Sequence, residues 1–305
     1  MEEKKLDLNS IIGFVLIFGI LLYMLYMNKP TPEEIEAQEK AEQEQVEAAK
    51  KIENITNELQ TSPADYSTVT ATDSTQLENL KNQLGAFAYS ASAGNTGDQE
   101  TILENDVLYL KISNKGGFVS EVKLKQFVDH DSLPVYLIKD DNALFNINFG
   151  TTDNRILNTK DLNFEPSLTS SGQNKILSMK LKVSDSRYLE YRYELKPDDY
   201  MLGFSVRSQG LNNVINSSQE VSLDWKLKGY SQAKSITYEN RYTRLTYQYE
   251  GNKIDKLGQM SDDEETEEDV SWISFRQHFF SSILVSDQPF KSAYLTSSQP
   301  AGSGQ

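Results

Sequence analysis

The stretch LEYRYEL at residues 189–195 alternates apolar and charged side chains from end to end. A period of two is the spacing of a β-strand that buries one face and exposes the other. The turn-forming residues Pro197, Asp198 and Asp199 follow, and apolar side chains then return at alternate positions, 202, 204 and 206. This region therefore predicts a β-hairpin.

The same period recurs later in the chain. Residues 221–228 place Val221, Leu223 and Trp225 on one face and polar side chains on the other. Another alternating set, at 245–249, ends at a Gly-Asn pair. Each set predicts a strand with one buried face.

A glycine pair marks an earlier hairpin. Apolar residues alternate over 108–112 and 122–124, on either side of Gly116 and Gly117, which can adopt the positive φ of a tight turn. No long helical pattern separates any of these strands. We therefore expect residues 101–305 to form a mainly β, antiparallel sandwich domain.

The N-terminal region contains an uncharged apolar run, IIGFVLIFGILLYMLYM, at residues 11–27. As a helix it would be about 26 Å long, enough to span a bilayer. Because no small-residue cleavage pattern follows, we expect an uncleaved transmembrane helix, not a cleaved signal peptide or a buried core helix. The side chains expected to contact lipid are Ile11, Ile12, Phe14, Leu16, Phe18, Leu21, Leu22, Tyr23 and Tyr26.

Charges beside this run predict its orientation. Lys4 and Lys5 precede it and Lys29 follows it, so the positive-inside rule favours a cytoplasmic N-terminus at residues 1–10. The rest of the chain would then lie on the periplasmic side of a cell inner membrane.

Two segments of different composition follow the run. Residues 31–60 begin with a capping box and are rich in Glu, Gln, Ala and Lys, which predicts a solvated helical stalk in preference to a coiled coil. Residues 61–100 are rich in Ser, Thr, Asn and Gly, which predicts a flexible linker. Leu77, Leu80 and Leu84 could form a short helix within it.

Composition excludes several functions. A net charge of −15 and the lack of any basic run argue against nucleic acid, and against an anionic membrane surface, as a principal partner. The chain has no cysteine, which excludes disulfides, thiolate metal sites and cysteine nucleophiles. No phosphate-binding loop or zinc-protease motif is present. We expect no cofactor, no metal and no catalytic residue.

The two histidines fit structural roles better than catalytic ones. His130 lies in a hydrophilic turn, where an exposed loop residue is expected. If residues 272–284 form one strand, His278 shares a face with Trp272 and Phe280 and packs at its rim. The acidic run 262–269 lacks the spacing of a calcium loop, so a solvated loop is expected.

Tyrosine is abundant in the β region. A stacking platform for sugar or peptide is one interpretation, but tyrosine on strands usually packs in a core, and we favour core packing. The tyrosines concerned are Tyr188, Tyr191, Tyr193, Tyr238, Tyr242, Tyr247 and Tyr249.

Three segments resemble one protein family. ISNKGGFVSEVKL at 112–124 is similar to an early β-hairpin of the YidC membrane protein insertases of bacteria. WISFRQHFFSSIL at 272–284 is similar to a stretch late in their periplasmic domain, and residues 1–32 resemble insertases of Bacteroidetes-type bacteria. The motif residues expected to serve packing or partner contact are Gly116, Gly117, Trp272, Gln277, Phe279 and Phe280.

The resemblance implies a β-supersandwich fold related to galactose mutarotases. It also implies a non-enzymatic role in the insertion, folding and assembly of inner-membrane proteins. The implied partners are the lipid bilayer, Sec translocon components and nascent membrane proteins. The late part of the family's periplasmic domain is implicated in translocon contact, which points toward 272–284.

Departures from the family leave alternatives open. Family members carry five further transmembrane helices and a polar groove with a functional arginine, which do not occur in this sequence, and the last strands of the periplasmic domain are expected to be missing. We therefore expect an N-terminal part of an insertase, without the insertion groove. The alternatives are a membrane-anchored carbohydrate-binding or mutarotase-like protein, and an envelope scaffold without a ligand.

Overall fold

The computed structural model describes residues 74–92, 99–258 and 261–298, all within one compact unit, Tyr66–Gln305. The predictions for residues 1–10, the apolar run at 11–27 and the stalk at 31–60 fall outside this part of the chain. Within the described ranges, no helix is both long enough and apolar enough to traverse a bilayer.

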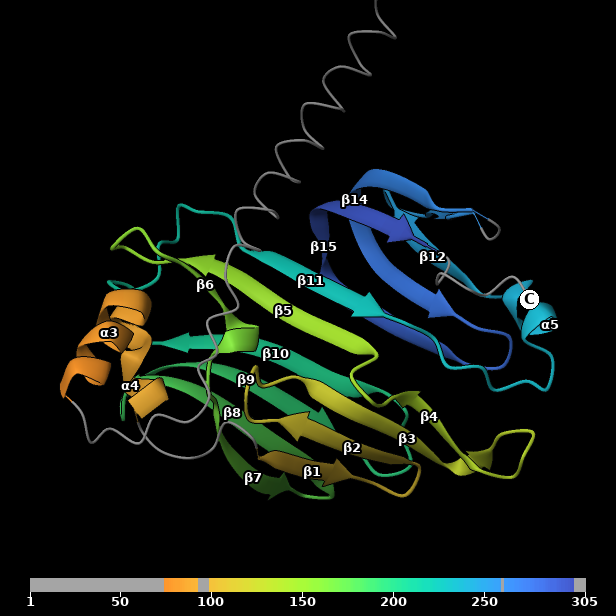
Figure 1. The fold of residues 1–305 in the computed structure, drawn as a ribbon, viewed down its shortest axis with the longest axis horizontal. Coiled ribbons are helices and arrows are strands. Elements are labelled where there is room, and N and C mark those ends of the chain that lie inside the picture. Colours follow the sequence, from red (N-terminus) through yellow and green to blue (C-terminus); the bar gives the residue numbers. More distant parts are fainter. Residues whose placement is uncertain (1–73, 93–98, 259–260, 299–305) are drawn as a thin grey trace, which may run out of the picture. The chain divides into compact units, whose positions relative to one another are not determined.

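Four antiparallel sheets make up the domain (Figure 1). The first has the order β1-β2-β3-β4, the second β10-β9-β8-β7, the third β11-β5-β6 and the fourth β13-β12-β14-β15. The first sheet comprises β1 (Glu100–Glu104), β2 (Leu108–Ser113), β3 (Val119–Val128) and β4 (Pro134–Ile138). The second comprises β7 (Glu165–Ser171), β8 (Asn174–Ser184), β9 (Arg187–Leu195) and β10 (Leu202–Gln209). The third comprises β5 (Ala143–Gly150), β6 (Ile156–Asn158) and β11 (Ser222–Leu227). The fourth comprises β12 (Arg244–Tyr249), β13 (Lys253–Lys256), β14 (Asp263–Arg276) and β15 (Ser281–Ser297).

Short helices connect or flank these sheets. They are α3 (Ser74–Leu84), η1 (Gly85–Phe87), α4 (Ala88–Ser92), η2 (Thr159–Asp161) and α5 (Ile236–Asn240). The mainly β, sandwich-like fold expected from the sequence is confirmed.

The hairpin predicted from residues 189–206 is present as β9 and β10. Leu195 pairs with Leu202 across the turn, and Leu189, Tyr191, Tyr193 and Leu195 are all buried. Asp198 takes a positive φ of 49° in this turn, a conformation that aspartate tolerates better than most residues.

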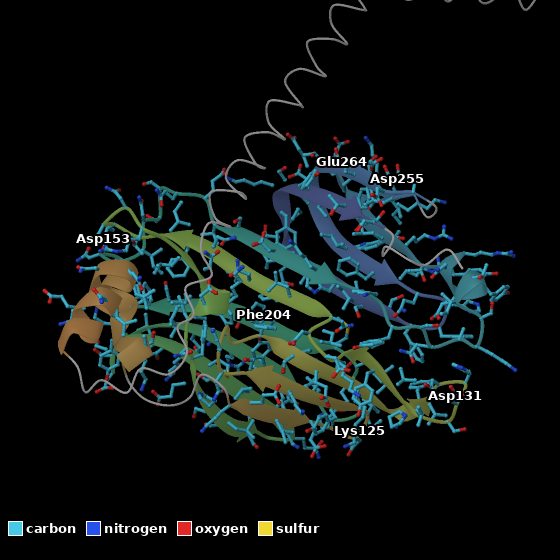
Figure 2. All side chains as sticks on the ribbon, viewed as in Figure 1. Lys125, Asp131, Asp153, Phe204, Asp255 and Glu264 are labelled. Carbon is cyan, nitrogen blue, oxygen red and sulfur yellow. The ribbon has the colours of Figure 1, made fainter. Side chains whose placement is uncertain are left out.

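Aromatic side chains at the centre of the domain connect the second sheet to the third sheet and to a turn of the first. Phe204 of β10 lies 5.2 Å from the ring of Tyr191, 5.0 Å from that of Tyr193 and 5.5 Å from that of Phe145 on β5 (Figure 2). The Tyr193 hydroxyl donates a 2.6 Å hydrogen bond to the carbonyl of Gly117 between β2 and β3. The second sheet therefore contacts both the third sheet and the turn of the first.

The flexible linker predicted over 61–100 is wrong for residues 74–92, which are helical. The helix suggested by its leucines is confirmed, because Leu80, Leu84 and Phe87 are buried in the main core. Phe87 meets the ring of Phe149 at 5.4 Å, edge to face. These few apolar side chains outweigh a local composition that is typical of a linker.

The solvated loop predicted for the acidic run 262–269 is also wrong. Residues from Asp263 onward belong to β14 and pair with the end of β15, from Glu268 opposite Ser292 to Asp263 opposite Ser297. The buried Tyr247 donates its hydroxyl proton to Glu265, and Tyr294 donates to Glu264 at 2.5 Å. Strand pairing and tyrosine donors thus offset the mutual repulsion of these carboxylates.

We predict that Gly117→Ala lowers the free energy of unfolding by about 2–4 kcal/mol, because backbone strain and a steric clash with a ring add together. Gly117 has φ +65°, and a Cβ there would approach the Phe164 ring to 3.0 Å. Gly172 is a matched control, since its φ is +61° but a Cβ would meet nothing within 4 Å. Chemical denaturation should find Gly172→Ala clearly milder, and equal effects would contradict the packing argument.

The pKa of Glu267 predicts how the stability of the domain depends on pH. Burial, followed by the nearby carboxylates of Glu265, Glu250 and Asp255, raises the pKa of Glu267 above its usual 4.5. When folding raises the pKa of a carboxyl group, the protonated group favours the folded state at low pH. That contribution to stability is lost as the pH rises through the raised pKa. Glu267→Gln should therefore stabilise the domain at pH 7, by less than about 1 kcal/mol because the site is only partly buried.

Well below pH 4.5 the same substitution should have no effect, because Glu267 is then protonated in both the folded and the unfolded state. Thermal unfolding at the two pH values measures the difference. The exposed neighbour Glu268 is the control, and a gain from Glu267→Gln that persists at low pH would refute the assignment.

Candidate functional site

A tight turn connects β14 to β15 at residues 277–280. The backbone N–H of Gln277 donates to the carbonyl of Phe280 at 2.8 Å, and Arg276 pairs with Ser281 to close the hairpin. Residues 272–284 are therefore not one strand, so the condition for His278 to share a face with Trp272 and Phe280 is not met. A turn without glycine or proline leaves no strong signal in the sequence, so the aromatic run reads as a continuous strand.

Gln277 fastens this turn to the loop before α5. Its side-chain Nε2 donates to the carbonyl of Tyr230 at 2.5 Å. A Cβ at Gly229 would lie 2.8 Å from the same Nε2, so a glycine is needed for this close approach. The motif glutamine thus has a packing and positioning role.

The two phenylalanines of the turn have different environments. Phe280 packs against the main core and meets the ring of Phe127, at the end of β3, edge to face at 5.3 Å. Phe279 is 61% exposed. One phenylalanine attaches the fourth sheet to the first, and the other is presented to solvent.

His278 lies among aromatic rings. It stacks on Tyr242 at 4.4 Å and meets Tyr238 at 5.2 Å and Phe279 at 4.2 Å. Its half-buried position agrees with the packed or rim histidine expected from the sequence.

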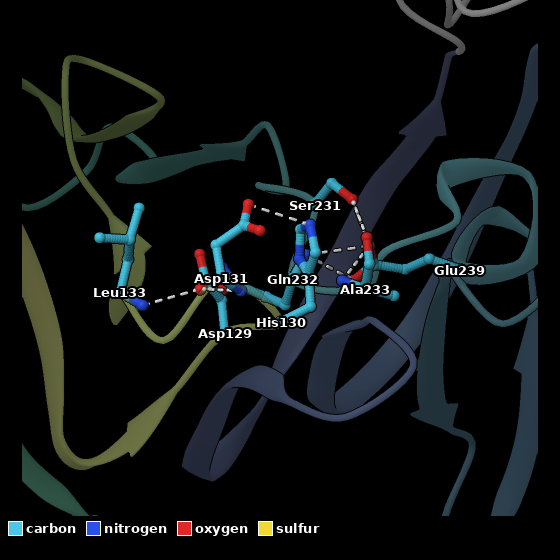
Figure 3. Close-up of polar contacts among 8 residues, drawn as sticks. All are labelled: Asp129, His130, Asp131, Leu133, Ser231, Gln232, Ala233 and Glu239. Atoms are coloured by element: carbon cyan, nitrogen blue, oxygen red, sulfur yellow. Dashed lines mark hydrogen bonds and ion pairs between the residues drawn. The ribbon is translucent and has the colours of Figure 1, made fainter.

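A buried carboxylate organises the loop that carries these tyrosines. Glu239 of α5 is 2% exposed and accepts hydrogen bonds from the Ser231 hydroxyl at 2.7 Å, the Gln232 N–H at 2.9 Å and the Ala233 N–H at 3.2 Å (Figure 3). The Gln232 side chain donates to the carbonyl of Tyr136 on β4 at 3.0 Å. Residues 231–239 are thereby fixed to the first sheet.

The turn between β3 and β4 holds His130. Asp129 accepts from the N–H groups of Asp131 and Leu133 at 2.8 and 2.9 Å, and the His130 ring lies 3.1 Å from the Asp131 carboxylate (Figure 3). The exposed loop histidine expected from the sequence is confirmed.

Together these elements form two groups of contacting rings joined by the turn at 277–280, which we call the aromatic ridge. Tyr200 approaches Phe127 at 6.3 Å, Phe127 contacts Phe280, and the turn connects these rings to the two tyrosines at α5. Its members are Tyr200, Phe127, Phe280, Phe279, His278, Tyr242 and Tyr238. Of these, Phe127, Tyr200 and Tyr238 are 43–45% exposed.

The side chains gathered here are suited to contact with a partner. In the described ranges, no group of three or more His, Asp or Glu side chains could hold a metal ion. Aromatic residues are enriched in protein interfaces, and here several are exposed on a rigid base. We therefore treat the aromatic ridge as a candidate interaction surface.

The remaining motif residues lie elsewhere. Gly116 and Gly117 take φ values of 85° and 65° in the turn before β3, at the opposite end of that strand from Phe127. Trp272 is half-buried in the fourth sheet, between Gln248 and Val285. The lipid-facing residues predicted over 11–27 fall outside the described ranges.

Sequence reasoning missed Phe127, Tyr200 and Glu239. Phe127 lies near the end of β3 and Tyr200 in the turn between β9 and β10, where an aromatic residue has no distinctive pattern. Glu239 becomes buried only because three donors from its own loop surround it.

A family model described as the YidC periplasmic domain matches residues 100–304. The chain belongs to this family. The resemblance inferred from the glycine hairpin and the aromatic stretch is thereby confirmed, and the match covers all four sheets.

Curated relatives extend the likeness toward the N-terminus. The membrane protein insertase YidC of Porphyromonas gingivalis is 35% identical over 294 residues, covering 95% of this chain and 45% of the relative. The insertase YidC of Parabacteroides distasonis is 32% identical, covering 96% and 46%, and that of Phocaeicola vulgatus is 32% identical, covering 98% and 46%. The chain spans slightly less than half the length of these relatives.

We predict that Phe280→Ala destabilises the domain by roughly 2 kcal/mol, less than the full cost of a completely buried ring. The control is Phe279→Ala, because Phe279 is 61% exposed and its loss should change stability by under about 0.5 kcal/mol. Urea unfolding of both variants makes the comparison. Equal destabilisation would show that Phe280 does not attach the fourth sheet.

Proposed function

We propose that this chain is the N-terminal part of a membrane protein insertase, which anchors and supplies the periplasmic domain. Membership of the YidC periplasmic domain family supports this most directly. The apolar run at 11–27 would be the anchor, with residues 1–10 in the cytoplasm and the described domain in the periplasm. The role is non-enzymatic and serves the insertion, folding and assembly of inner-membrane proteins.

We further propose that the aromatic ridge contacts Sec translocon components or nascent membrane proteins. Its rings combine exposed apolar area with a base held by the Gln277 and Glu239 hydrogen bonds. A rigid base reduces the entropy lost on binding. The ridge includes Phe279 and Phe280, the aromatic pair of the 272–284 motif.

A mutarotase-like activity is not favoured. Such chemistry needs a general acid and a general base on either side of a sugar ring. His130 contacts only its neighbour Asp131 on an exposed turn, and the His278 ring is enclosed by Tyr238, Tyr242 and Phe279. Similarity of fold alone is not evidence for an enzymatic activity.

Site-specific photo-crosslinking in cells that express the chain tests this contact. A benzoyl-phenylalanine at position 279 should crosslink to translocon subunits or to nascent membrane proteins, because Phe279 is the most exposed ring of the ridge. Leu168 on β7 is the matched control, since it is apolar and 51% exposed but lies in the second sheet. Crosslinks of equal yield from both positions, or none from 279, would overturn the proposal.

A further inference from the structure

Basic side chains from three strands meet on one face of the fourth sheet. Arg244 of β12 lies directly opposite Arg276 of β14, and Thr246 lies opposite Lys256 of β13. Cross-strand partners project from the same face of a sheet. Arg241 directly follows α5, and its carbonyl accepts from Nη2 of Arg244 at 3.3 Å. We call Arg244, Arg276 and Lys256, together with Arg241, which is placed here by its backbone contact, the basic face.

These cations have no carboxylate partner within the described part of the chain. Ion pairs there involve Lys111, Lys125, Arg155, Lys182, Arg192, Lys253 and His130, and none involves a member of the basic face. Two arginines directly opposite one another repel and destabilise a sheet. In a chain of net charge −15, such an arrangement indicates a binding partner that carries negative charge.

Unpaired polar atoms lie at the same place. Nε of Arg244, Oγ1 of Thr246 and Nδ1 of His278 are buried, and none makes a hydrogen bond within the described part of the chain. Thr246 is adjacent to Ser274 across the strands, and His278 stacks on Tyr242, between Arg241 and Arg244 in sequence. A buried donor without an acceptor costs free energy, so the isolated domain leaves these donors unsatisfied at this end of the sheet.

Exposed apolar side chains border the basic face. Ile283 and Val285 of β15 are each 56% exposed and pair with Ser274 and Trp272, which places them on the same face. Ile254 of β13 pairs with Gln248 and is 62% exposed. Cations set among aliphatic and aromatic side chains are typical of surfaces that lie in a membrane interface.

We propose that the basic face docks onto a bilayer surface containing anionic phospholipids. The guanidinium groups of Arg244 and Arg276 bind headgroup phosphates, and Ile254, Ile283 and Val285 enter the interface. Charge complementarity selects this occupant, because phosphate accepts the paired hydrogen bonds that arginine donates.

The acidic side chains of the fourth sheet are compatible with this orientation. Glu264 lies at the other end of β14 from Arg276, near Asp255 in projection (Figure 2). Glu265 is directed to Tyr247, whose ring is in the core on the opposite face from Arg244 and Thr246. Glu264 and Glu268, both exposed, lie in the half of β14 beyond the bulge between Val270 and Trp272, so distance along the strand separates them from Arg276.

The basic face could not be predicted from the sequence. Its members lie at 241, 244, 256 and 276, so no basic run appears along the chain. The expectation that the protein avoids anionic membrane surfaces rested on net charge, which does not describe the local arrangement. Strand pairing alone brings these residues together.

The test uses the full chain in nanodiscs. The chain has no cysteine, so Ile283→Cys gives a single labelling site for a fluorophore, and headgroup spin labels report its distance from the bilayer. Quenching should be strong with anionic lipid, weak with phosphatidylcholine alone, and reduced by salt. A label at Leu168→Cys, on the second sheet, should not be quenched in either lipid.

Charge variants test whether the basic face is responsible for docking. Arg276→Gln should lower the ratio of docked to undocked chain about fivefold, as expected for one cation near a charged membrane. Arg207→Gln removes the same charge from an exposed site on β10 and should leave the ratio unchanged. Arg244→Gln should act like Arg276→Gln, with circular dichroism confirming that each variant is folded.

Two outcomes would overturn the proposal. One is quenching that does not depend on anionic lipid or responds equally to Arg276→Gln and Arg207→Gln. The other is saturable binding of inorganic phosphate to the detergent-solubilised chain without lipid-dependent quenching, which would assign the site to a small free anion. The test rests on the anchor proposed above, and co-elution with the nanodisc separates a failure of anchoring from a failure of docking.

Discussion

The packing of Phe204 against Tyr191, Tyr193 and Phe145 is the contact on which the rest of the domain depends. It joins the second and third sheets, and the Tyr193 hydroxyl extends it to the Gly117 turn of the first. Each sheet by itself is a set of strands with one apolar face, which is unstable in water. Burying those faces against one another provides the rigid base to which the fourth sheet attaches through Phe280.

Period-two patterns allowed much of this fold to be predicted. The β9–β10 hairpin, the strand β11 and the glycine turn before β3 each depend on local alternation or on residues that favour a turn. Predictions failed where distant contacts override composition. The acidic half of β14 is a strand because β15 pairs with it, and residues 74–92 are helical because the β core covers their leucines.

The two candidate surfaces also differ in how far the sequence predicts them. The aromatic pair at 279 and 280 could be singled out from its motif, although its place in a turn could not. The basic face required knowledge of strand order, since Arg244 and Arg276 become neighbours only through the β12–β14 pairing. A local sequence pattern can therefore identify a motif, whereas a surface assembled from several strands requires the fold.

Strand order in the third sheet also constrains how the chain reaches its native state. The first and second sheets are meanders of consecutive strands, which can form as soon as their residues are synthesised. β5 is different, because its partner β11 lies beyond the whole second sheet and pairs Ser222 with Asn148. Until residue 227 has emerged, the edge of β5 stays open to wrong partners. Synthesis from the N-terminus therefore leaves an interval in which this strand has an unpaired edge.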